Sequence, residues 1–248
     1  MKPKVIIFDL DGTLAESKQR VSAEVGDLLS QLLQKHMVAI MSGATFGQFE
    51  TQLLPSISDA PLEHLYLFAV NGGQCFVYKN GTWNPQYDHS FSAAESANIK
   101  EQITKVLPQI GFEMPPQLWG EQIEDRGAQI TFSALGQQAP LAEKEAWAQA
   151  HGTVRKQLRD ALAAALPGCT VEMGGITSVD VTPKGIDKSF GIKRLVELTQ
   201  IPVSDMLYIG DALEEGGNDS VVIATGVATH EVFSIAETTG IIERIIAL

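Results

Sequence analysis

The sequence has few cysteines, few positive charges and no long apolar runs, and each shortage excludes a class of protein. Its two cysteines, Cys75 and Cys169, lack the spacing of a zinc site or a disulfide framework, so we expect two reduced thiols. With 18 basic and 30 acidic residues, the formal charge of -12 argues against nucleic acid as a partner, because lysine and arginine supply most of the affinity for a phosphate backbone. The apolar run at 5–8 is too short for a signal peptide, and no later run reaches the length of a membrane span. We therefore expect a cytoplasmic protein with no membrane partner.

Both ends of the chain show an alternation of strand and helix patterns. A length of 248 residues allows either one large α/β domain or a core with an inserted second domain. Short apolar runs, each followed by Gly, Asp, Ser or Asn, predict buried parallel strands at 5–8, 38–41, 65–70 and 206–209. Apolar residues at helical spacing over 21–33 and 190–198 predict helices that cross between such strands. The two ends of the chain are therefore expected to share one sheet.

The middle of the chain has a different pattern, typical of an α+β insertion. Amphipathic helices are predicted over 93–107 and 143–166, and strands over 129–133, 170–173 and 177–181. Gly174 and Gly175 predict a hairpin turn between the last two strands. We therefore expect a core domain made of residues 1–86 and 184–248, and a second domain made of residues 87–183.

Two aspartates, Asp9 and Asp11, follow the first predicted strand in the segment FDLDGT. They are two residues apart, so both side chains can leave the carboxyl end of the strand toward one crevice. Two carboxylates in one crevice are costly unless a positive charge joins them, and Mg²⁺ commonly bridges one or two carboxylates to a substrate phosphate. The segment therefore favours a magnesium site. A plain strand followed by an Asp-Gly turn is the alternative.

Three further residues are predicted to lie at the same edge of the sheet. Ser42 follows the second predicted strand and Asp211 follows the strand at 206–209, and α/β proteins bind ligands at this edge. Lys188 begins the helical pattern that returns the chain to the core, where its ammonium group can meet a phosphate oxygen. Taken alone, Lys188 fits a solvated lysine near a helix start better. Together with the aspartates and Ser42, it favours a phosphate site.

The segment DLDGT, the serine after a second strand, the lysine and the GD segment resemble, in this order, the four motifs of the haloacid dehalogenase superfamily. The segment GDALEEGGND, residues 210–219, resembles the eukaryotic-type phosphomannomutases of subfamily IIB more than ordinary phosphatases of that subfamily. SVDVTPKGIDK, VNGG and IEDRG are also similar to segments of that family. The resemblance implies an α/β fold with a Rossmann-like three-layer core, a parallel sheet and an inserted α+β cap of type C2B. It also implies a homodimer formed through the cap.

The resemblance further implies a role for each motif residue. Asp9 would be the nucleophile that forms an aspartyl-phosphate, Asp11 the general acid/base, and Ser42 and Lys188 the groups that hold the transferring phosphoryl group. The implied ligands of Mg²⁺ are Asp9, the backbone carbonyl of Asp11, and Asp211, supported by Asn218 or Asp219. The implied substrate-binding residues are Lys18, Arg126, Ser178 and Asp180. These roles agree with the needs of phosphoryl transfer, which are an in-line nucleophile, charge neutralisation and a proton for the leaving group.

The sequence departs from the phosphomannomutase pattern where that family holds the second phosphate of its sugar. Several cap arginines hold this phosphate in the family, but here Arg126 matches, and Gln137 and Lys144 occupy two other arginine positions. Lys18 likewise stands at an arginine position of the core. Lysine and glutamine cannot reproduce the planar bidentate contact of arginine with phosphate. The second phosphate site is therefore expected to be weaker.

This departure favours hydrolysis of a phosphorylated sugar or similar small metabolite, because a mutase must hold two phosphates alternately. A hexose phosphomutase is the alternative, and Arg155 or Arg159 would support it by replacing the missing arginines. A non-catalytic phospho-ligand-binding module is the third hypothesis, since receiver domains also gather acids at strand ends. The separate Asp11 and the size of the insertion argue against this third hypothesis.

Overall fold

The structure is a computed structural model that describes residues 3–57 and 59–247, and the chain divides into two compact units. The core unit comprises the chain up to Asp88 together with the chain from Asp187 onward. The insert unit comprises His89–Ile186. The division predicted from the sequence had its junctions after residue 86 and before residue 184.

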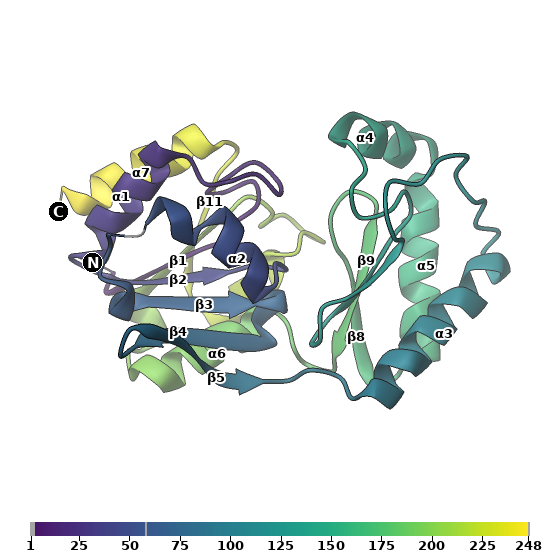
Figure 1. The fold of residues 1–248 in the computed structure, drawn as a ribbon, viewed down its shortest axis with the longest axis horizontal. Helices are drawn as coiled ribbons and strands as arrows, with labels where there is room; N and C mark the ends of the chain where they lie inside the picture. The colour runs from purple at the N-terminus through teal and green to yellow at the C-terminus, as the bar shows by residue number, and fades with distance from the viewer. Residues whose placement is uncertain (1–2, 58, 248) are drawn as a thin grey trace. The chain divides into compact units, whose positions relative to one another are not determined.

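The core unit is built on a seven-stranded sheet with the order β11-β10-β1-β2-β3-β4-β5 (Figure 1). The first five strands in this order are parallel to one another, whereas β4 and β5 are antiparallel. The strands span Val5–Phe8 (β1), Met37–Met41 (β2), Leu65–Ala69 (β3), Gln74–Lys79 (β4), Thr82–Asp88 (β5), Met206–Gly210 (β10) and Ala228–Glu231 (β11). Strand β1 lies between β2 and β10, so the prediction that the two ends of the chain share one sheet is confirmed.

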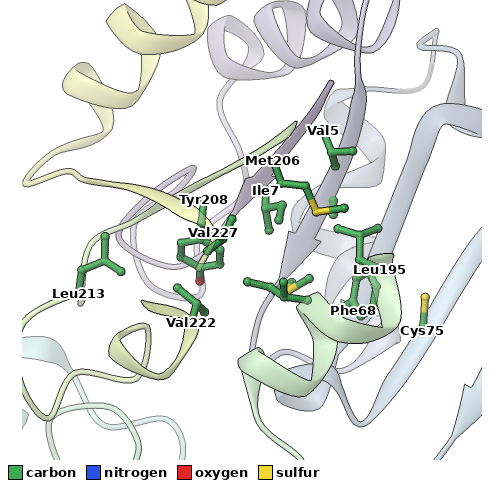
Figure 2. Close-up of a cluster of buried hydrophobic side chains, with 13 residues drawn as sticks. Val5, Ile7, Phe68, Cys75, Leu195, Met206, Tyr208, Leu213, Val222 and Val227 are labelled. Carbon is green, nitrogen blue, oxygen red and sulfur yellow. The ribbon is translucent and has the colours of Figure 1, made fainter. Parts of the chain in front are cut away.

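Helices cover both faces of this sheet and give the core unit three layers (Figure 1). Helices α1 (Ala23–Leu33) and α7 (Ile235–Ile246) pack against each other on one face, and α6 (Lys188–Thr199) covers the other face. Strand β1 is fully buried because its successive side chains point to both covered faces. On the α6 face, a cluster of buried side chains joins β1, β2, β3 and β10 to α6 (Figure 2). The predicted α/β fold with a three-layer core is thus confirmed.

Side-chain caps determine where the helices next to the carboxyl edge of the sheet begin. The Asp187 carboxylate accepts a hydrogen bond from the Phe190 N–H at 3.0 Å, so α6 begins at Lys188. A capping box between Thr45 and Gln48 starts the short helix α2 (Phe46–Gln52) after the loop that follows β2. Short 3-10 turns lie at Leu54–Ser56, Leu62–His64, Val70–Gly72, Val203–Asp205 and Ser220–Thr225.

The antiparallel hairpin of β4 and β5 was not predicted from the sequence. Its turn residues Asn80 and Gly81 have φ values of 54° and 80°, as the two-residue hairpin turn of type I′ requires. Both cysteines are free, with Cys75 buried in β4 and Cys169 partly buried in the insert unit. Among the described residues, we find no helix with the length and apolar character needed to cross a membrane.

The insert unit is an α+β structure with its own apolar core. Its sheet has the antiparallel order β6-β7-β9-β8, with strands at Ile123–Asp125 (β6), Ile130–Ser133 (β7), Cys169–Met173 (β8) and Ser178–Pro183 (β9). Its helices are α3 (Ala93–Gln109), α4 (Leu141–Ala150) and α5 (Gly152–Ala165). Apolar residues of α3 and α5 pack against β7, β8 and β9. The α+β character predicted for this segment is confirmed.

One helix predicted over 143–166 is two helices in the structure. His151 has φ -127° and ψ 30°, which are not helical values, and it ends α4 and precedes α5. Gly152 follows it, and glycine has a low helix propensity. The apolar periodicity on both sides of this break is helical, so periodicity alone did not reveal it.

Candidate active site

Three of the predicted site residues follow neighbouring parallel strands at one edge of the core sheet. Asp9 follows β1, Ser42 follows β2 and Asp211 follows β10. The register pairs Phe8 with both Ile40 and Ile209, so these three strands end side by side. The sheet therefore brings these three residues to one place, as expected from the position of each after an apolar run.

Lys188 joins this group from α6. Its side chain is 1% exposed, and its Nζ donates to Asp9 Oδ1 at 2.5 Å and to Asp219 Oδ1 at 2.6 Å. Burial alone would lower the pKa of Lys188, but the carboxylates of Asp219 and Asp9 outweigh it and raise the pKa well above its ordinary value. Lys188 is therefore a fixed positive charge beside the predicted nucleophile.

The carboxylates of Asp9, Asp211 and Asp219 form a group that could hold a metal ion. Each offers one oxygen, and these oxygens all lie within 4.8 Å of one another. Burial raises the pKa of Asp9 to about 8, with Asp219 and Asp211 adding to the rise and Lys188 opposing it. Burial also raises the pKa of Asp211, again with a contribution from Asp219. A hard cation fits this set, since it supplies the positive charge that the carboxylates lack and prefers oxygen ligands.

The predicted metal set was wider than this group. The side chain of Asp11 is not part of it, and Asn218 is exposed beside Asp219. Asp219, predicted only as a supporting residue, is 0% exposed and accepts hydrogen bonds on both carboxylate oxygens. Among the described residues, Asp219 is thus more closely integrated with Asp9 than Asn218 is.

Two glycines leave room for the acids. Gly12 has φ 90°, and a Cβ there would lie 2.3 Å from Asp211 Oδ2. A Cβ on Gly210 would lie 2.3 Å from Asp219 Oδ2. Real Cβ atoms essentially never approach other atoms so closely, so an alanine at either glycine would displace a carboxylate of the site.

Asp11 is held by two donors that fix its carboxylate. Its Oδ1 accepts from the backbone N–H of Lys18 at 2.9 Å and from Gln52 Nε2 at 3.2 Å. Gln52 is buried at the end of α2 and also donates to the carbonyl of Gln19 at 2.9 Å. Gln52 was not predicted as a site residue, because a single glutamine in an amphipathic segment carries no motif.

Ser42 is buried and is held by hydrogen bonds from its own loop and from the loop that follows β3. Its Oγ accepts from the N–H of Ala44 at 3.1 Å, and its carbonyl accepts from the N–H of Asn71 at 2.8 Å. Asn71 belongs to the VNGG segment and has φ 56°. The Asn-Gly turn noted in the sequence thus supports the backbone of Ser42.

The predicted substrate-binding residues of the insert unit lie on its sheet. Arg126 follows β6 and donates from Nε and Nη2 to Glu124 Oε2 at 3.0 and 2.6 Å. Asp180 Oδ1 accepts from Thr131 Oγ1 at 2.8 Å, across the β7–β9 pair. Ser178 lies two residues before Asp180 in β9, so the two side chains share one face of the sheet.

The structure also places the residues that the resemblance aligns with family arginines, and the two arginines considered as their replacements. Gln137 Nε2 donates to the carbonyl of Gln122 at 3.3 Å, and Lys144 lies in the first turn of α4. Arg155 Nη1 donates to the carbonyl of Gly175 at 2.5 Å, in the hairpin turn between β8 and β9. Arg159 pairs with its neighbour Asp160 at 2.6 Å. Arg155 and Arg159 were considered as replacements for the missing cap arginines. Of these two, Arg155 is held by the turn between β8 and β9.

The chain matches known proteins over most of its length. A family model described as eukaryotic phosphomannomutase matches residues 25–248. The chain is similar to the phosphomannomutase of Saccharomyces cerevisiae, with 26% identity over 254 residues that cover 100% of this chain and 96% of the relative.

Solved structures show the same fold. An IMP-nucleotidase from Plasmodium falciparum aligns with a TM-score of 0.72 and 18% identity, over 99% of this chain and 68% of that one. A haloacid dehalogenase-like hydrolase from Bacteroides thetaiotaomicron aligns with a TM-score of 0.65 and 16% identity, over 98% and 100%. The curated relatives support the mutase alternative better than the phosphatase that the sequence favoured, and both are phosphoryl-transfer enzymes.

Proposed function

The chain belongs to the eukaryotic phosphomannomutase family, and from this premise we propose that it is a phosphohexose mutase that works through an aspartyl-phosphate on Asp9. The observation that carries the proposal is the buried contact of Lys188 with both Asp9 and Asp219. Asp211 lies at the same edge of the sheet, beside these two acids. Phosphoryl transfer depends on positioning and on neutralising the charge of the transferring group. A carboxylate nucleophile beside a fixed ammonium group meets both needs.

In the proposed reaction, Asp9 attacks one phosphorus of a hexose bisphosphate, the sugar oxygen leaves, and the resulting monophosphate departs. A hexose 1-phosphate then binds with its own phosphate in the second phosphate site, and its free hydroxyl attacks the aspartyl-phosphate. The bisphosphate so formed turns over and returns its other phosphoryl group to Asp9, which releases the 6-phosphate isomer. Lys188 and the hydroxyl of Ser42 hold the oxygens of the transferring phosphoryl group. Asp11 gives a proton to the departing sugar oxygen and takes a proton from the hydroxyl of the sugar monophosphate that attacks the aspartyl-phosphate. The donors on Asp11 Oδ1, the Lys18 N–H and Gln52, hold its carboxylate in place for both steps.

We assign a Mg²⁺ site to Asp9, Asp211 and Asp219, with the backbone carbonyl of Asp11 as a further ligand. When bound, Mg²⁺ would neutralise charge on the phosphoryl oxygens and on the aspartates. The fit rests on the oxygen donors of the three carboxylates, which lie within 4.8 Å of one another.

We assign to the insert unit the role of a cap that holds the sugar, through Arg126, Ser178 and Asp180. A cap that closes over the site would exclude water from the aspartyl-phosphate, which separates a mutase from a hydrolase. Lys18 of the core unit would contact the substrate as well.

Hydrolysis of the same sugar phosphates is the second candidate, and one observation favours it. The resemblance aligns Gln137 and Lys144 with arginine positions of the family, and the Gln137 side chain donates to the backbone carbonyl of Gln122. A weak second phosphate site would let the sugar leave before the aspartyl-phosphate returns its phosphoryl group, and water would then attack.

The proposal is tested with purified protein, Mg²⁺ and either mannose 1-phosphate or glucose 1-phosphate, with and without a hexose bisphosphate. Both the 6-phosphate isomer and free phosphate are followed. Isomer formation that depends on the bisphosphate supports the mutase, whereas steady release of phosphate with no isomer rejects it in favour of the phosphatase. Asp9→Asn should abolish both products, and Asp27→Asn, an exposed aspartate of α1, is the matched control.

Arginine substitutions in the insert unit separate the two candidates further. If phosphate loss competes with isomerisation, Gln137→Arg and Lys144→Arg should raise the ratio of isomer to free phosphate, since each restores a bidentate phosphate contact. An unchanged ratio would show that these positions do not hold the second phosphate.

A further inference from the structure

Tyr208 is a buried tyrosine of β10 that reaches the site from the core. It is 0% exposed, and its ring packs among apolar side chains such as Ile7, Val222 and Val227 (Figure 2). The register pairs Tyr208 with Ile7, two residues before Asp9. A buried phenol needs a partner for its hydroxyl, and here the partner is a carboxylate of the site.

The Tyr208 hydroxyl donates to Asp219 Oδ1 at 2.5 Å. The same oxygen accepts from Lys188 Nζ at 2.6 Å, and Lys188 Nζ also donates to Asp9 Oδ1 at 2.5 Å. The other oxygen of Asp219 accepts from the N–H of Ala212 at 3.3 Å. A continuous chain of hydrogen bonds therefore runs from Tyr208 through Asp219 and Lys188 to the predicted nucleophile.

The position of the phenol determines how Lys188 is shared. Asp219 and Asp9 compete for one ammonium group, and a second donor on Asp219 Oδ1 satisfies part of its charge. Without the hydroxyl, Asp219 would attract Lys188 more strongly and draw it away from Asp9 and from a phosphoryl group bound there. The hydroxyl also fixes the orientation of Asp219, since it holds one oxygen while the Ala212 N–H faces the other.

We propose that Tyr208 is a positioning residue of the phosphoryl-transfer site, which acts through Asp219 to hold Lys188 toward Asp9 and to orient Asp219 toward a bound metal ion. The inference rests on the proposed function and names a residue that the resemblance did not supply.

The test compares Tyr208→Phe with Tyr66→Phe. Tyr66 lies in β3 and packs against the same apolar cluster, so its substitution removes a hydroxyl from the same unit away from the acids. Calorimetric titration with Mg²⁺ alone, without substrate, should give a dissociation constant about 10-fold higher for Tyr208→Phe, since partners of metal ligands are worth roughly 10- to 100-fold in affinity or activity. With a sugar phosphate, kcat should fall by about the same factor while KM stays within about twofold.

A merely structural hydroxyl would give a different result. Tyr208→Phe would then lower the unfolding midpoint in urea but leave Mg²⁺ affinity and kcat equal to those of Tyr66→Phe, and this outcome would overturn the proposal. Failure of the wild-type protein to bind Mg²⁺ would overturn it too. If no sugar phosphate reacts but Tyr208→Phe still weakens Mg²⁺ binding, the proposed function fails and the positioning role stands.

A double substitution tests the hydrogen bond between Tyr208 and Asp219 by changing its acceptor as well as its donor. In an Asp219→Asn background, the phenol no longer faces a carboxylate, so adding Tyr208→Phe should change Mg²⁺ affinity by less than about twofold. Equal effects of Tyr208→Phe in both backgrounds would show that the hydroxyl does not act through Asp219. Near-UV circular dichroism establishes that each variant is folded. If Tyr208→Phe does not fold, Asp219→Asn serves as the test. Unchanged Mg²⁺ binding by Asp219→Asn then rejects the proposal.

Discussion

Replacement of Lys188 by methionine should destabilise the core unit more than any surface lysine substitution. The methionine keeps most of the volume but leaves Asp9 and Asp219 without their shared cation. The two contacts, at 2.5 and 2.6 Å, are each worth roughly 6 kcal/mol of Coulomb energy at an effective dielectric constant of about 20. Desolvation offsets much of this, and removing one partner of a buried ion pair typically costs about 3–5 kcal/mol. We expect the free energy of unfolding to fall by that amount in the absence of Mg²⁺.

The assay is urea unfolding followed by circular dichroism, with Lys193→Met as the control. Lys193 is an exposed lysine of the same helix, so its loss should cost less than about 1 kcal/mol. Hydrogen exchange gives each unit its own readout, since peptides of β1 and β10 report on the core unit and peptides of β7 and β9 on the insert unit. The loss of protection should be confined to the core unit.

Saturating Mg²⁺ should reduce the deficit of Lys188→Met, because a cation bound to the three carboxylates replaces the lost charge and stabilises the folded state through its binding energy. Equal deficits for Lys188→Met and Lys193→Met, or a stabilised Lys188→Met variant, would refute the reasoning. Either result would mean that Lys188 is not needed to neutralise the acids.

Three further outcomes are expected. Gly12→Ala should cost roughly 1–3 kcal/mol more in urea than Gly216→Ala, because both glycines have positive φ but only the Gly12 Cβ meets a carboxylate oxygen at 2.3 Å; equal costs would leave only backbone strain. Gln52→Leu should lower kcat by about 10-fold with little change in KM, since it removes one of the donors that orient the acid/base carboxylate, and an unchanged kcat would assign Gln52 to stability alone. At pH 8, iodoacetamide should label Cys169 well before Cys75, because burial raises the pKa of Cys75 to about 12 and leaves on the order of 1 thiol in 10,000 as thiolate; mass spectrometry of native and urea-treated protein measures this, and faster labelling of Cys75 would contradict it.

The centre of the fold and the strand-end residues were predictable because local patterns specify them. Strand β1 is a short run of apolar residues between charged neighbours, and the Asp9 that follows it has no other place than the sheet edge. Ser42 and Asp211 likewise follow short apolar runs and were predictable as residues of the same sheet edge. The hairpin of β4 and β5 also carried a local signal, Asn80-Gly81, but β5 contains a proline and many polar residues, which obscured it.

The connections between site residues were not predictable, because they depend on how distant elements pack. Gln52 reaches Asp11 from a separate helix, and Tyr208 reaches Asp219 across the end of its own strand. In the sequence, Tyr208 is typical of a residue in a buried strand, because it lies in an apolar run. No neighbouring residue predicts that its hydroxyl donates to a carboxylate. Asp219 itself was recognised only through resemblance, and its full burial with three donors emerges from the tertiary structure.

The order of strands in the core sheet also affects how the protein is made. Of the strands of the core sheet, β1 emerges first from the ribosome, yet one of its two neighbours, β10, begins at Met206, and the Lys188 that neutralises Asp9 is 179 residues away in the chain. Contacts of such sequence separation slow folding. Until the last quarter of the chain is synthesised, β1 has one unpaired edge and Asp9 has no cation. A nascent or truncated chain that ends within the insert unit is therefore expected to expose an apolar strand edge that invites aggregation, and this edge stays unpaired until β10, which ends at Gly210, is released.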